Sequence, residues 1–447
     1  MKSVALHTLG CKLNYSETST LAKQFEAKGM KLGQYGEKTD VFVLNTCSVT
    51  DNADRECRQI IRSVLRKNPD TYVIVTGCYA QLQPGEIAHI EGVDLILGSK
   101  EKLRLFDYLE NFDPASPSCI FKEQGSKIFV SGLDEVNSEV SAAYSADIDS
   151  RTRAFLKIQD GCDYSCTFCT IPLARGGSRS LPLDTVLDNA KKIGDAGYRE
   201  IILTGVNTGD YRYFDEESKT TKKLIDVLYG LDKIGVERVR ISSIEPNLLS
   251  DEIISLVKSS ERFCRHFHIP LQSGDPEVLK LMKRRYNTGL YRNLIMKLNS
   301  EIPDAGIGVD VIIGFPGESD EYFRNTADFL DGLNISYLHV FSYSERKNTP
   351  AAGFADKVDI RTRRNRSEIL RNISAKKRYD FYSRYIGTRQ KVLFETSVVN
   401  VDGKEYMEGW TSNYIRVRTR LNTALQNKIA EVELKNLSGI GPVDCEL

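Results

Sequence analysis

The densest group of reactive side chains is Cys162, Cys166 and Cys169, which follow a C-x3-C-x2-C pattern. Three thiolates this close in sequence can hold three irons of a [4Fe–4S] cluster. No fourth cysteine lies nearby, so one iron would stay open to an external ligand. Structural zinc normally takes four closed ligands, and a ferredoxin-type electron carrier needs a fourth cysteine and another spacing. Both alternatives are therefore disfavoured.

A second group is Cys11, Cys47 and Cys78, which lie far apart in sequence. Each follows a short apolar run that reads as a strand, and Gly10 and Gly77 precede two of them. In an open α/β sheet, the carboxyl ends of the strands form the ligand-binding crevice, and glycine lets backbones approach closely. We therefore expect the three thiols to converge on a second metal site. Three unrelated buried thiols are the alternative.

The elements that carry the second group lie in residues 1–112, where strands alternate with helical patterns. This alternation predicts an open parallel sheet covered by helices. Residues 113–147 turn polar and read as a linker with a short edge strand at Lys127–Val130. The strands expected in the N-terminal segment are Val4–His7, Val41–Leu44, Tyr72–Thr76 and Asp94–Leu97.

The cysteine triplet belongs to residues 148–378, which alternate again over six strands. Six βα units predict an open partial (β/α)6 barrel, and the triplet follows its first strand, at the active-site end. Glycines after other strands permit backbone contact with a cofactor, and polar residues there lie at the barrel mouth. Two arginines beyond the triplet could clamp a carboxylate or phosphate. The strands are Phe155–Gln159, Glu200–Thr204, Arg238–Ser242, His266–Pro270, Ile307–Ile313 and Tyr337–Ser342. The ligand-binding candidates are Gly205, Ser243, Glu245, Gln272, Arg175 and Arg179.

The last part of the chain combines basic and aromatic residues. Residues 361–384 hold nine Lys or Arg against two acids, which indicates either a solvated helix face or a phosphate-contacting surface. Residues 379–447 read as a small antiparallel β-barrel. On one strand Arg416 and Arg418 share a face, near Trp410 and Tyr414, and this combination suits RNA.

Composition narrows the setting of the protein. The 447 residues carry 61 Lys and Arg and 61 Asp and Glu, so an RNA-binding surface must be local. We find no signal peptide and no apolar stretch that could span a membrane. We therefore expect a cytoplasmic protein, in which ten cysteines point to metal binding before disulfides.

Taken together, these motifs resemble the radical S-adenosylmethionine (SAM) methylthiotransferases over nearly the whole chain. The resemblance implies an auxiliary-cluster domain at residues 1–112, a radical SAM core at 148–378 and a TRAM domain, a small RNA-binding barrel, at 379–447. The segments that carry it are 8–14 (TLGCKLN), 45–47 (NTC), 77–79 (GCY), 157–161 (KIQDG), 171–176 (IPLARG) and 409–414 (GWTSNY).

The resemblance also implies a chemistry. Cys162, Cys166 and Cys169 would hold a cluster whose open iron binds SAM, and reductive cleavage of SAM would give a 5′-deoxyadenosyl radical. A second [4Fe–4S] cluster on Cys11, Cys47 and Cys78 would present sulfur, and a second SAM would supply the methyl group. We expect SAM to lie near Phe168, Gly205, Ser243, Glu245, Gln272 and Asp310.

The branch of the family sets the substrate. Segments 7–12 (HTLGCK), 45–50 (NTCSVT) and 338–344 (LHVFSYS) are most similar to enzymes that modify N6-threonylcarbamoyladenosine (t6A) at position 37 of tRNA. This branch implies a tRNA partner, a flavodoxin- or ferredoxin-type reductant and a monomer. The t6A carboxylate needs a basic partner, for which Arg175 and Arg179 are the candidates.

Three other readings stay open from sequence. The same chemistry could act on N6-isopentenyladenosine in tRNA or on an aspartate of a ribosomal protein. A non-catalytic, metal-bearing RNA-binding protein would explain the basic helix and the small barrel, but it leaves six organised cysteines without a purpose.

Overall fold

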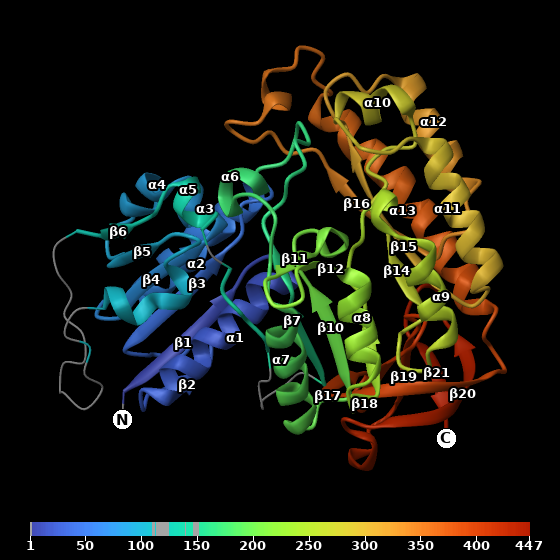
Figure 1. The fold of residues 1–447 in the computed structure, drawn as a ribbon, viewed down its shortest axis with the longest axis horizontal. Coiled ribbons are helices and arrows are strands. Elements are labelled where there is room, and N and C mark those ends of the chain that lie inside the picture. Colours follow the sequence, from blue (N-terminus) through green and yellow to red (C-terminus); the bar gives the residue numbers. More distant parts are fainter. Residues whose placement is uncertain (1, 110–111, 113–124, 139, 146–151) are drawn as a thin grey trace. The chain divides into compact units, whose positions relative to one another are not determined.

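The computed structural model describes residues 2–109, 112, 125–138, 140–145 and 152–447 (Figure 1). By internal contacts it forms two compact units that interleave along the chain. Unit 1 comprises residues 1–145, 155–181 and 344–352, and unit 2 comprises residues 146–154, 182–343 and 353–447. Residues 113–124 of the predicted linker lie outside the described residues, and the domain boundaries stay predictions.

Unit 1 contains a six-stranded parallel sheet in the order β2-β1-β3-β4-β5-β6. Its central strands are continuous buried apolar runs, as expected for a parallel sheet covered on both faces. All four predicted strands are confirmed, as is the short edge strand, and β2 is an addition that the sequence did not predict. The bounds are β1 Ser3–Thr8, β2 Lys31–Gly33, β3 Val41–Thr46, β4 Tyr72–Gly77, β5 Leu95–Leu97 and β6 Lys127–Phe129.

Helices cover both faces of this sheet (Figure 1). One core includes Leu21 and Phe25 of α1 (Lys12–Ala27) and Leu105 of the 3-10 helix η1 (Lys102–Tyr108). The other includes Ile61 of α2 and Tyr79 of α3. The remaining bounds in unit 1 are α2 Asp51–Lys67, α3 Cys78–Leu82, α4 Pro84–Ala88, α5 Leu133–Val136, β8 Gln159–Asp160, α6 Ile171–Arg175 and β9 Arg179–Ser180.

The six strands predicted for the central segment are all present. In unit 2, β10 pairs in parallel with β13, and β15 pairs in parallel with β14 and β16. A parallel bridge between Ser243 and His268 connects these two groups of strands. The bounds are β7 Arg153–Lys157, β10 Glu200–Thr204, β13 Arg238–Arg240, β14 His266–His268, β15 Gly306–Ile313 and β16 Tyr337–Ser342.

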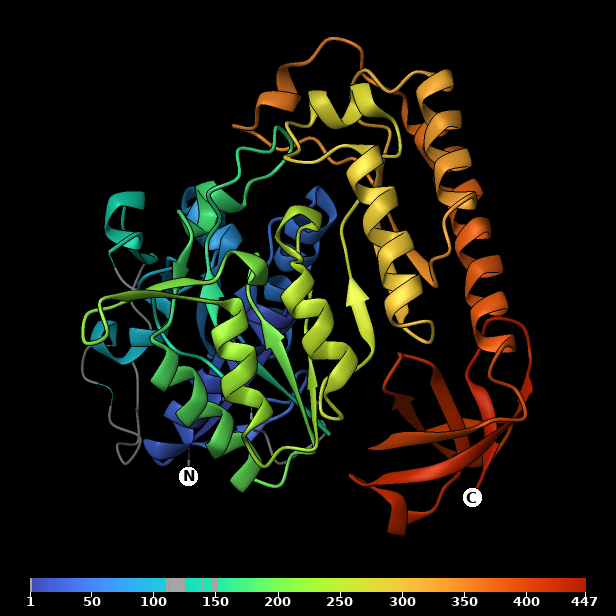
Figure 2. The same cartoon turned by 45° about the vertical axis from the view of Figure 1, so that its right-hand side comes forward.

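Helices follow these strands in the alternating pattern that the sequence predicted. Figure 2 shows α13 (Ile360–Ser383) as the long orange helix that leads to the red C-terminal strands. An antiparallel hairpin, β11 (Arg212–Asp215) and β12 (Thr220–Lys223), interrupts the alternation. The other helices are α7 Leu183–Asp195, α8 Leu224–Asp232, α9 Asp251–Ser259, α10 Pro276–Leu281, α11 Thr288–Glu301 and α12 Asp320–Asp331, with 3-10 turns η2 Thr208–Asp210, η3 Pro246–Leu248 and η4 Pro350–Gly353.

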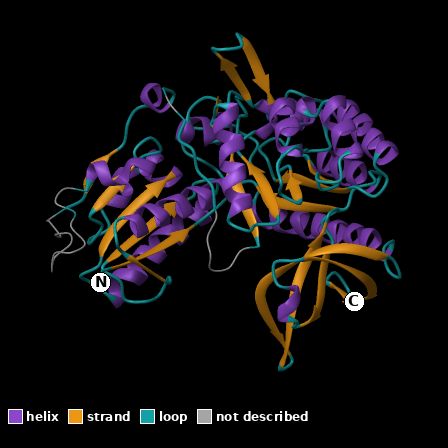
Figure 3. Cartoon of the chain, turned by 60° about the horizontal axis from the view of Figure 1, so that its bottom comes forward, coloured by secondary structure: helices purple, strands orange, loops and turns teal. Residues whose placement is uncertain are grey.

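The C-terminal strands close into a barrel in the order β17-β18-β19-β21-β20 (Figure 3). The sequence predicted three strands here, at Gln390–Glu395, Asn413–Arg418 and Ile429–Leu434, and it missed β18 and β21. The second of these strands, β19, begins only after Tyr414, which lies in a left-handed turn with φ 72°. The bounds are β17 Arg389–Val401, β18 Lys404–Thr411, β19 Arg416–Arg420, η5 Thr423–Leu425, β20 Ile429–Leu437 and β21 Val443–Glu446.

A buried ion pair joins the strands of unit 2 to this barrel. The Arg240 Nε donates to Glu200 Oε1 at 2.8 Å, and its two terminal nitrogens donate to the carbonyls of Ser412 and Thr411. Both charged side chains are at most 1% exposed. Burial alone would raise the pKa of the Glu200 carboxyl, but Arg240 lowers it to about 2.

We predict that Arg240→Met lowers the free energy of unfolding by about 3–5 kcal/mol, because it leaves Glu200 buried without its partner. Urea denaturation measures the change. The control is Arg199→Met, which breaks an exposed ion pair with Glu237 and should cost no more than about 1 kcal/mol. Equal losses in the two variants would contradict the prediction.

Candidate functional site

Three cysteines of unit 1 follow neighbouring strands at the carboxyl edge of the sheet. Thr46 is paired with Gly77 in the register of β3 and β4, so Cys47 and Cys78 each come directly after paired residues. Cys11 comes three residues after Thr8 of β1, at the N-cap of α1. The sequence predicted this placement.

Two glycines allow these loops to approach one another. Gly10 has φ +100°, and a Cβ there would lie 2.8 Å from the Cys47 Sγ. Gly77 has φ +98°, and a Cβ there would lie 2.5 Å from the Thr46 carbonyl oxygen. Any larger residue would be strained in conformation and would collide with its neighbour.

Burial and neighbouring charges raise the pKa of two of these thiols, Cys47 and Cys11. Burial, and next the Cys78 thiol, raise the pKa of Cys47 to about 12. Desolvation also raises the pKa of the Cys11 thiol, although that residue keeps exposed surface, and Arg175 opposes the shift. Such thiols stay protonated at neutral pH unless a metal compensates their charge, and an all-sulfur donor set suits an iron–sulfur cluster.

The loop of the cysteine triplet lies against the loop that carries Cys47. The Thr170 hydroxyl donates to the Ser48 carbonyl at 3.4 Å. Arg346 binds the Ser48 hydroxyl at 2.7 Å and forms a buried ion pair with Asp54 at 2.5 Å. The amide of Ala351 donates to the Thr167 carbonyl at 2.9 Å. Residues 344–352, which come after β16, therefore hold the two cysteine loops together within unit 1.

Backbone amides point at the sulfurs of the triplet. Tyr164 N–H donates to Cys162 Sγ and Ile171 N–H to Cys169 Sγ, each at 3.4 Å. Hydrogen bonds of this kind stabilise cluster thiolates and tune the reduction potential. The triplet therefore fits the cluster that its spacing predicted.

A buried network of charges lies next to these loops. Arg175 Nη1 contacts Glu17 at 3.1 Å and Asp160 at 2.9 Å. Lys102 binds Glu17 at 2.6 Å, and Lys157 binds Asp160 at 2.7 Å. These residues come from α1, η1, β7, β8 and α6, so the network joins the N-terminal sheet to the triplet segment.

The network has three cations and two carboxylates, so it is short of negative charge. Burial alone would raise the pKa of Glu17, but Arg175, Lys102 and Lys157 hold it well below its usual range. Burial alone would lower the pKa of Arg175, but Glu17 and Asp160 hold it well above its usual range. Arg175 opposes the rise in the pKa of the Cys11 thiol, and a thiolate-bound cluster would balance the unmatched positive charge.

Arg175 and Arg179 were both candidates for binding a substrate carboxylate. Arg175 is 1% exposed, and its other terminal nitrogen donates to Asn14 Oδ1 at 2.5 Å, so its binding capacity is used within the protein. This geometry favours a positioning role. Arg179 is partly buried, and its Nη1 donates to the Gly177 carbonyl at 2.7 Å.

Most of the residues expected near SAM lie in unit 2. Ser243 bridges to His268, whose Nε2 is 2.7 Å from Asp310 Oδ1. Gln272 has φ +68°, an uncommon conformation for a residue other than glycine, and its amide donates to the Asp310 carbonyl at 2.8 Å. Glu245 pairs with Arg284, and burial raises the pKa of Glu245. The structure thus brings Ser243, Gln272 and Asp310 together.

The other two residues expected near SAM are Gly205 and Phe168. Gly205 follows β10 and is partly exposed. Phe168 is partly exposed and belongs to unit 1.

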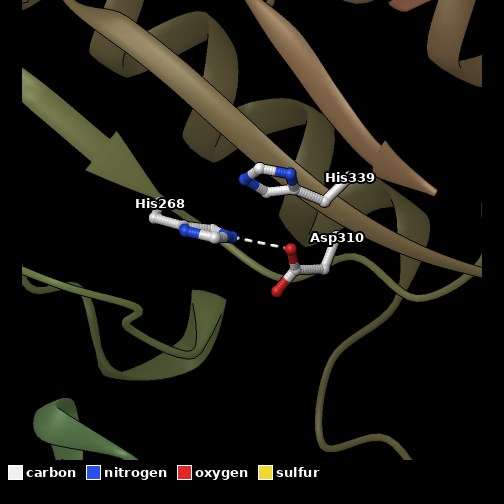
Figure 4. A group of neighbouring side chains, drawn as sticks. All are labelled: His268, Asp310 and His339. Atoms are coloured by element: carbon white, nitrogen blue, oxygen red, sulfur yellow. Dashed lines mark hydrogen bonds and ion pairs between the residues drawn. The ribbon is translucent and has the colours of Figure 1, made fainter. Parts of the chain in front are cut away.

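His268, Asp310 and His339 form a polar cluster on three adjacent strands (Figure 4). Asp310 and His339 are directly paired in the register of β15 and β16. His268 and His339 have ring centroids 5.3 Å apart. Sequence spacing does not predict this grouping, because its three members come from three separate strands.

The residues predicted to bind RNA already have partners in the protein. Trp410 stacks on Tyr414 with ring centroids 4.4 Å apart, and Tyr414 stacks on His266 at 4.4 Å. Arg416 pairs with Glu408, and Arg418 pairs with Asp444 at 2.8 Å. Arg416 and Arg418 lie at alternating positions of β19, as predicted.

The sequence argument also missed Glu17, Lys102 and Lys157. A charged residue within an otherwise apolar strand, such as Lys157 in the run FLKIQDG, was the available signal. No spacing rule connects that residue with Glu17, which is 140 positions away.

Two family models match separate segments of the chain. Residues 3–98 match the model of uncharacterized protein family UPF0004, and residues 156–330 match that of the radical SAM superfamily. The chain is 36% identical to the threonylcarbamoyladenosine tRNA methylthiotransferase MtaB of Bacillus subtilis, over 97% of this chain and 94% of that one. It is 32% identical to the MtaB of Thermotoga maritima, over 100% and 97%.

Two further matches are more distant. A tRNA-2-methylthio-N(6)-dimethylallyladenosine synthase of Clostridium botulinum is 30% identical, over 97% and 96% of the two chains. The structure of the radical SAM methyltransferase TsrM of Kitasatospora setae matches with a TM-score of 0.53 and 14% identity, over 78% and 77%, which shows a shared fold. No helix among the described residues has the length and apolar character needed to cross a membrane.

We predict that Glu17→Gln lowers the free energy of unfolding at neutral pH by about 3–5 kcal/mol, because three buried cations lose a carboxylate. The pKa of Glu17 is lowered in the folded state, so its contribution is complete at neutral pH. It declines once the pH falls below about 4, where the unfolded carboxyl takes up a proton.

Urea denaturation at neutral pH and near pH 4 measures both effects. The control is Glu135→Gln, which removes an exposed carboxylate paired with Lys100 and should change stability little. A gap between wild type and Glu17→Gln that widens on acidification would contradict the assignment.

Proposed function

The chain belongs to the threonylcarbamoyladenosine tRNA methylthiotransferase family, and we propose that it adds a methylthio group to C2 of t6A at position 37 of tRNA. One observation carries the proposal. The Cys47 loop and the cysteine triplet loop contact one another through Ser48 and Thr170. Transfer of sulfur to an activated substrate needs the two centres to share one pocket.

In this proposal the chain holds two [4Fe–4S] clusters and SAM. Cys162, Cys166 and Cys169 hold the SAM-binding cluster, and the second is held by Cys11, Cys47 and Cys78. When bound, these groups supply one-electron cleavage of SAM, hydrogen abstraction at the adenine and the sulfur that is transferred.

The chain's own residues position and shield these groups. Ser243, Gln272 and Asp310 bind SAM, with Gln272 held in a strained conformation of the kind that occurs at ligand sites. Arg175 acts as a positioning residue, since it connects Asn14 of α1 with the triplet segment. The closely packed loops exclude water from the reacting groups.

The tRNA is bound mainly through its phosphates. The α13 helix carries most of the basic run at residues 361–384, and basic side chains neutralise backbone charge. Trp410 and Tyr414 support this surface from within the protein. The protein works as a cytoplasmic monomer and receives electrons from a flavodoxin- or ferredoxin-type protein.

A reconstitution experiment should distinguish the roles of the two cysteine groups. Anaerobic reconstitution of the wild type should give about eight irons per chain, and replacing either group by alanine should leave about four. Alanine at Cys162, Cys166 and Cys169 should abolish SAM cleavage. Alanine at Cys11, Cys47 and Cys78 should retain SAM cleavage and abolish 2-methylthio-t6A. Iron analysis, 5′-deoxyadenosine release and mass spectrometry of tRNA nucleosides are the readouts.

Cys445→Ala is the matched control, because this buried thiol lies on β21 of the small barrel and belongs to neither group, and it should retain about eight irons. Product formed only on N6-isopentenyladenosine tRNA would reject the t6A assignment. Full iron content after loss of either group would reject the two-cluster arrangement.

A further inference from the structure

A cavity of about 200 Å³ opens in unit 2 beside β16. Pockets for whole ligands usually span roughly 300–1,000 Å³, so this cavity suits a substituent better than a complete nucleotide. Its lining combines aromatic rings with basic side chains. The lining includes Tyr337, His339, Arg378, Trp410, Tyr414 and Arg416.

The cavity lies beside the edge strand of a sheet. β16 is the last strand in the order β14-β15-β16, and α13 covers its edge. The Ser374 hydroxyl accepts the Leu338 amide at 2.9 Å and donates to the Leu338 carbonyl at 3.0 Å. One helical turn further along, the Arg378 guanidinium lies 5.7 Å from the centre of the Tyr337 ring.

The aromatic wall of the cavity is already packed. Trp410, Tyr414 and His266 form a stacked column, and the Tyr337 hydroxyl is 2.8 Å from His266 Nε2. The Arg153 guanidinium also lies 5.2 Å from the Trp410 ring centre. These rings shape a rigid wall, and they are poorly placed to stack on an incoming base.

The cavity contains positive charge that no acid of the described chain neutralises. Arg416 is paired with Glu408, whereas the structure shows no ion pair for Arg378 among the described residues. His339 is exposed, and it is paired in register with Asp310, one of the residues proposed to bind SAM. The cavity is therefore lined by a guanidinium and an imidazole, and the imidazole belongs to a residue paired in register with Asp310.

We propose that this cavity binds the N6-threonylcarbamoyl substituent of the substrate, with Arg378 on its carboxylate and His339 on its urea or hydroxyl group. This inference rests on the proposed function. A carboxylate leaving water needs a charge-assisted partner, and Arg175 is occupied within unit 1. Arg378 and His339 thus select an anionic substituent over an apolar one of similar size.

The test measures binding of anticodon stem-loop RNAs to the reconstituted enzyme by fluorescence anisotropy. The three RNAs carry t6A, adenosine or N6-isopentenyladenosine at position 37. Arg378→Met should reduce the preference for t6A over adenosine by about 10- to 100-fold. Arg378→Lys should retain part of this preference, and His339→Phe should lower the preference for t6A over N6-isopentenyladenosine.

The matched control is Arg371→Met, which removes an exposed arginine from the same helix outside the cavity. It should leave the ratio of affinities unchanged. Iron content, measured in every variant, reports whether the protein is folded and loaded.

Two results would overturn the inference. If Arg378→Met weakens all three RNAs equally, the residue contacts a backbone phosphate. If the ratio of affinities for the t6A and adenosine RNAs is the same in Arg378→Met as in the wild type, the cavity does not recognise the N6 substituent. Either result leaves the proposed function intact when the wild type still forms 2-methylthio-t6A. Absence of that product from the wild type would instead reject the proposed function itself.

Discussion

The arrangement of unit 1 depends on one buried ion network centred on Glu17 and Arg175. These residues lie 158 positions apart, and their contact joins the first helix to the segment that carries the cysteine triplet. Removing one partner from such a network leaves an uncompensated charge in the interior, so its members depend on one another. Arg175 also opposes the rise in the pKa of the neighbouring Cys11 thiol, so the network that joins these segments also acts on a cysteine of the first group.

A buried ion pair also joins the strands of unit 2 to the small barrel. Arg240 and Glu200 form a buried pair that also binds backbone carbonyls of the small barrel. The column of Trp410, Tyr414 and His266 adds aromatic contact to the same junction. Residues that look suited to RNA, such as Trp410 and Tyr414, therefore already have partners within the protein.

Much of the fold and of the candidate cluster sites could be predicted from local patterns in the sequence. The spacing of Cys162, Cys166 and Cys169 indicates a cluster with an open iron, because three neighbouring thiolates can bind three irons. Strand and helix periods predicted the six strands that alternate with helices in the central segment, and they missed the short strands β8, β9, β11 and β12. The assignment of Arg175 to a substrate carboxylate could not be checked in this way, since an exposed and a buried arginine look alike in sequence.

The sequence by itself determined the two sets of cysteines, the alternating α/β pattern and the small terminal barrel, because each follows from spacing or periodicity within a short window. Only the tertiary structure decided that Ser48 meets Thr170, that Arg175 is enclosed by Glu17 and Asp160, and that Arg378 lines a cavity with His339. Such contacts depend on how whole elements pack. That packing is set by the summed burial of many side chains, which no local pattern records.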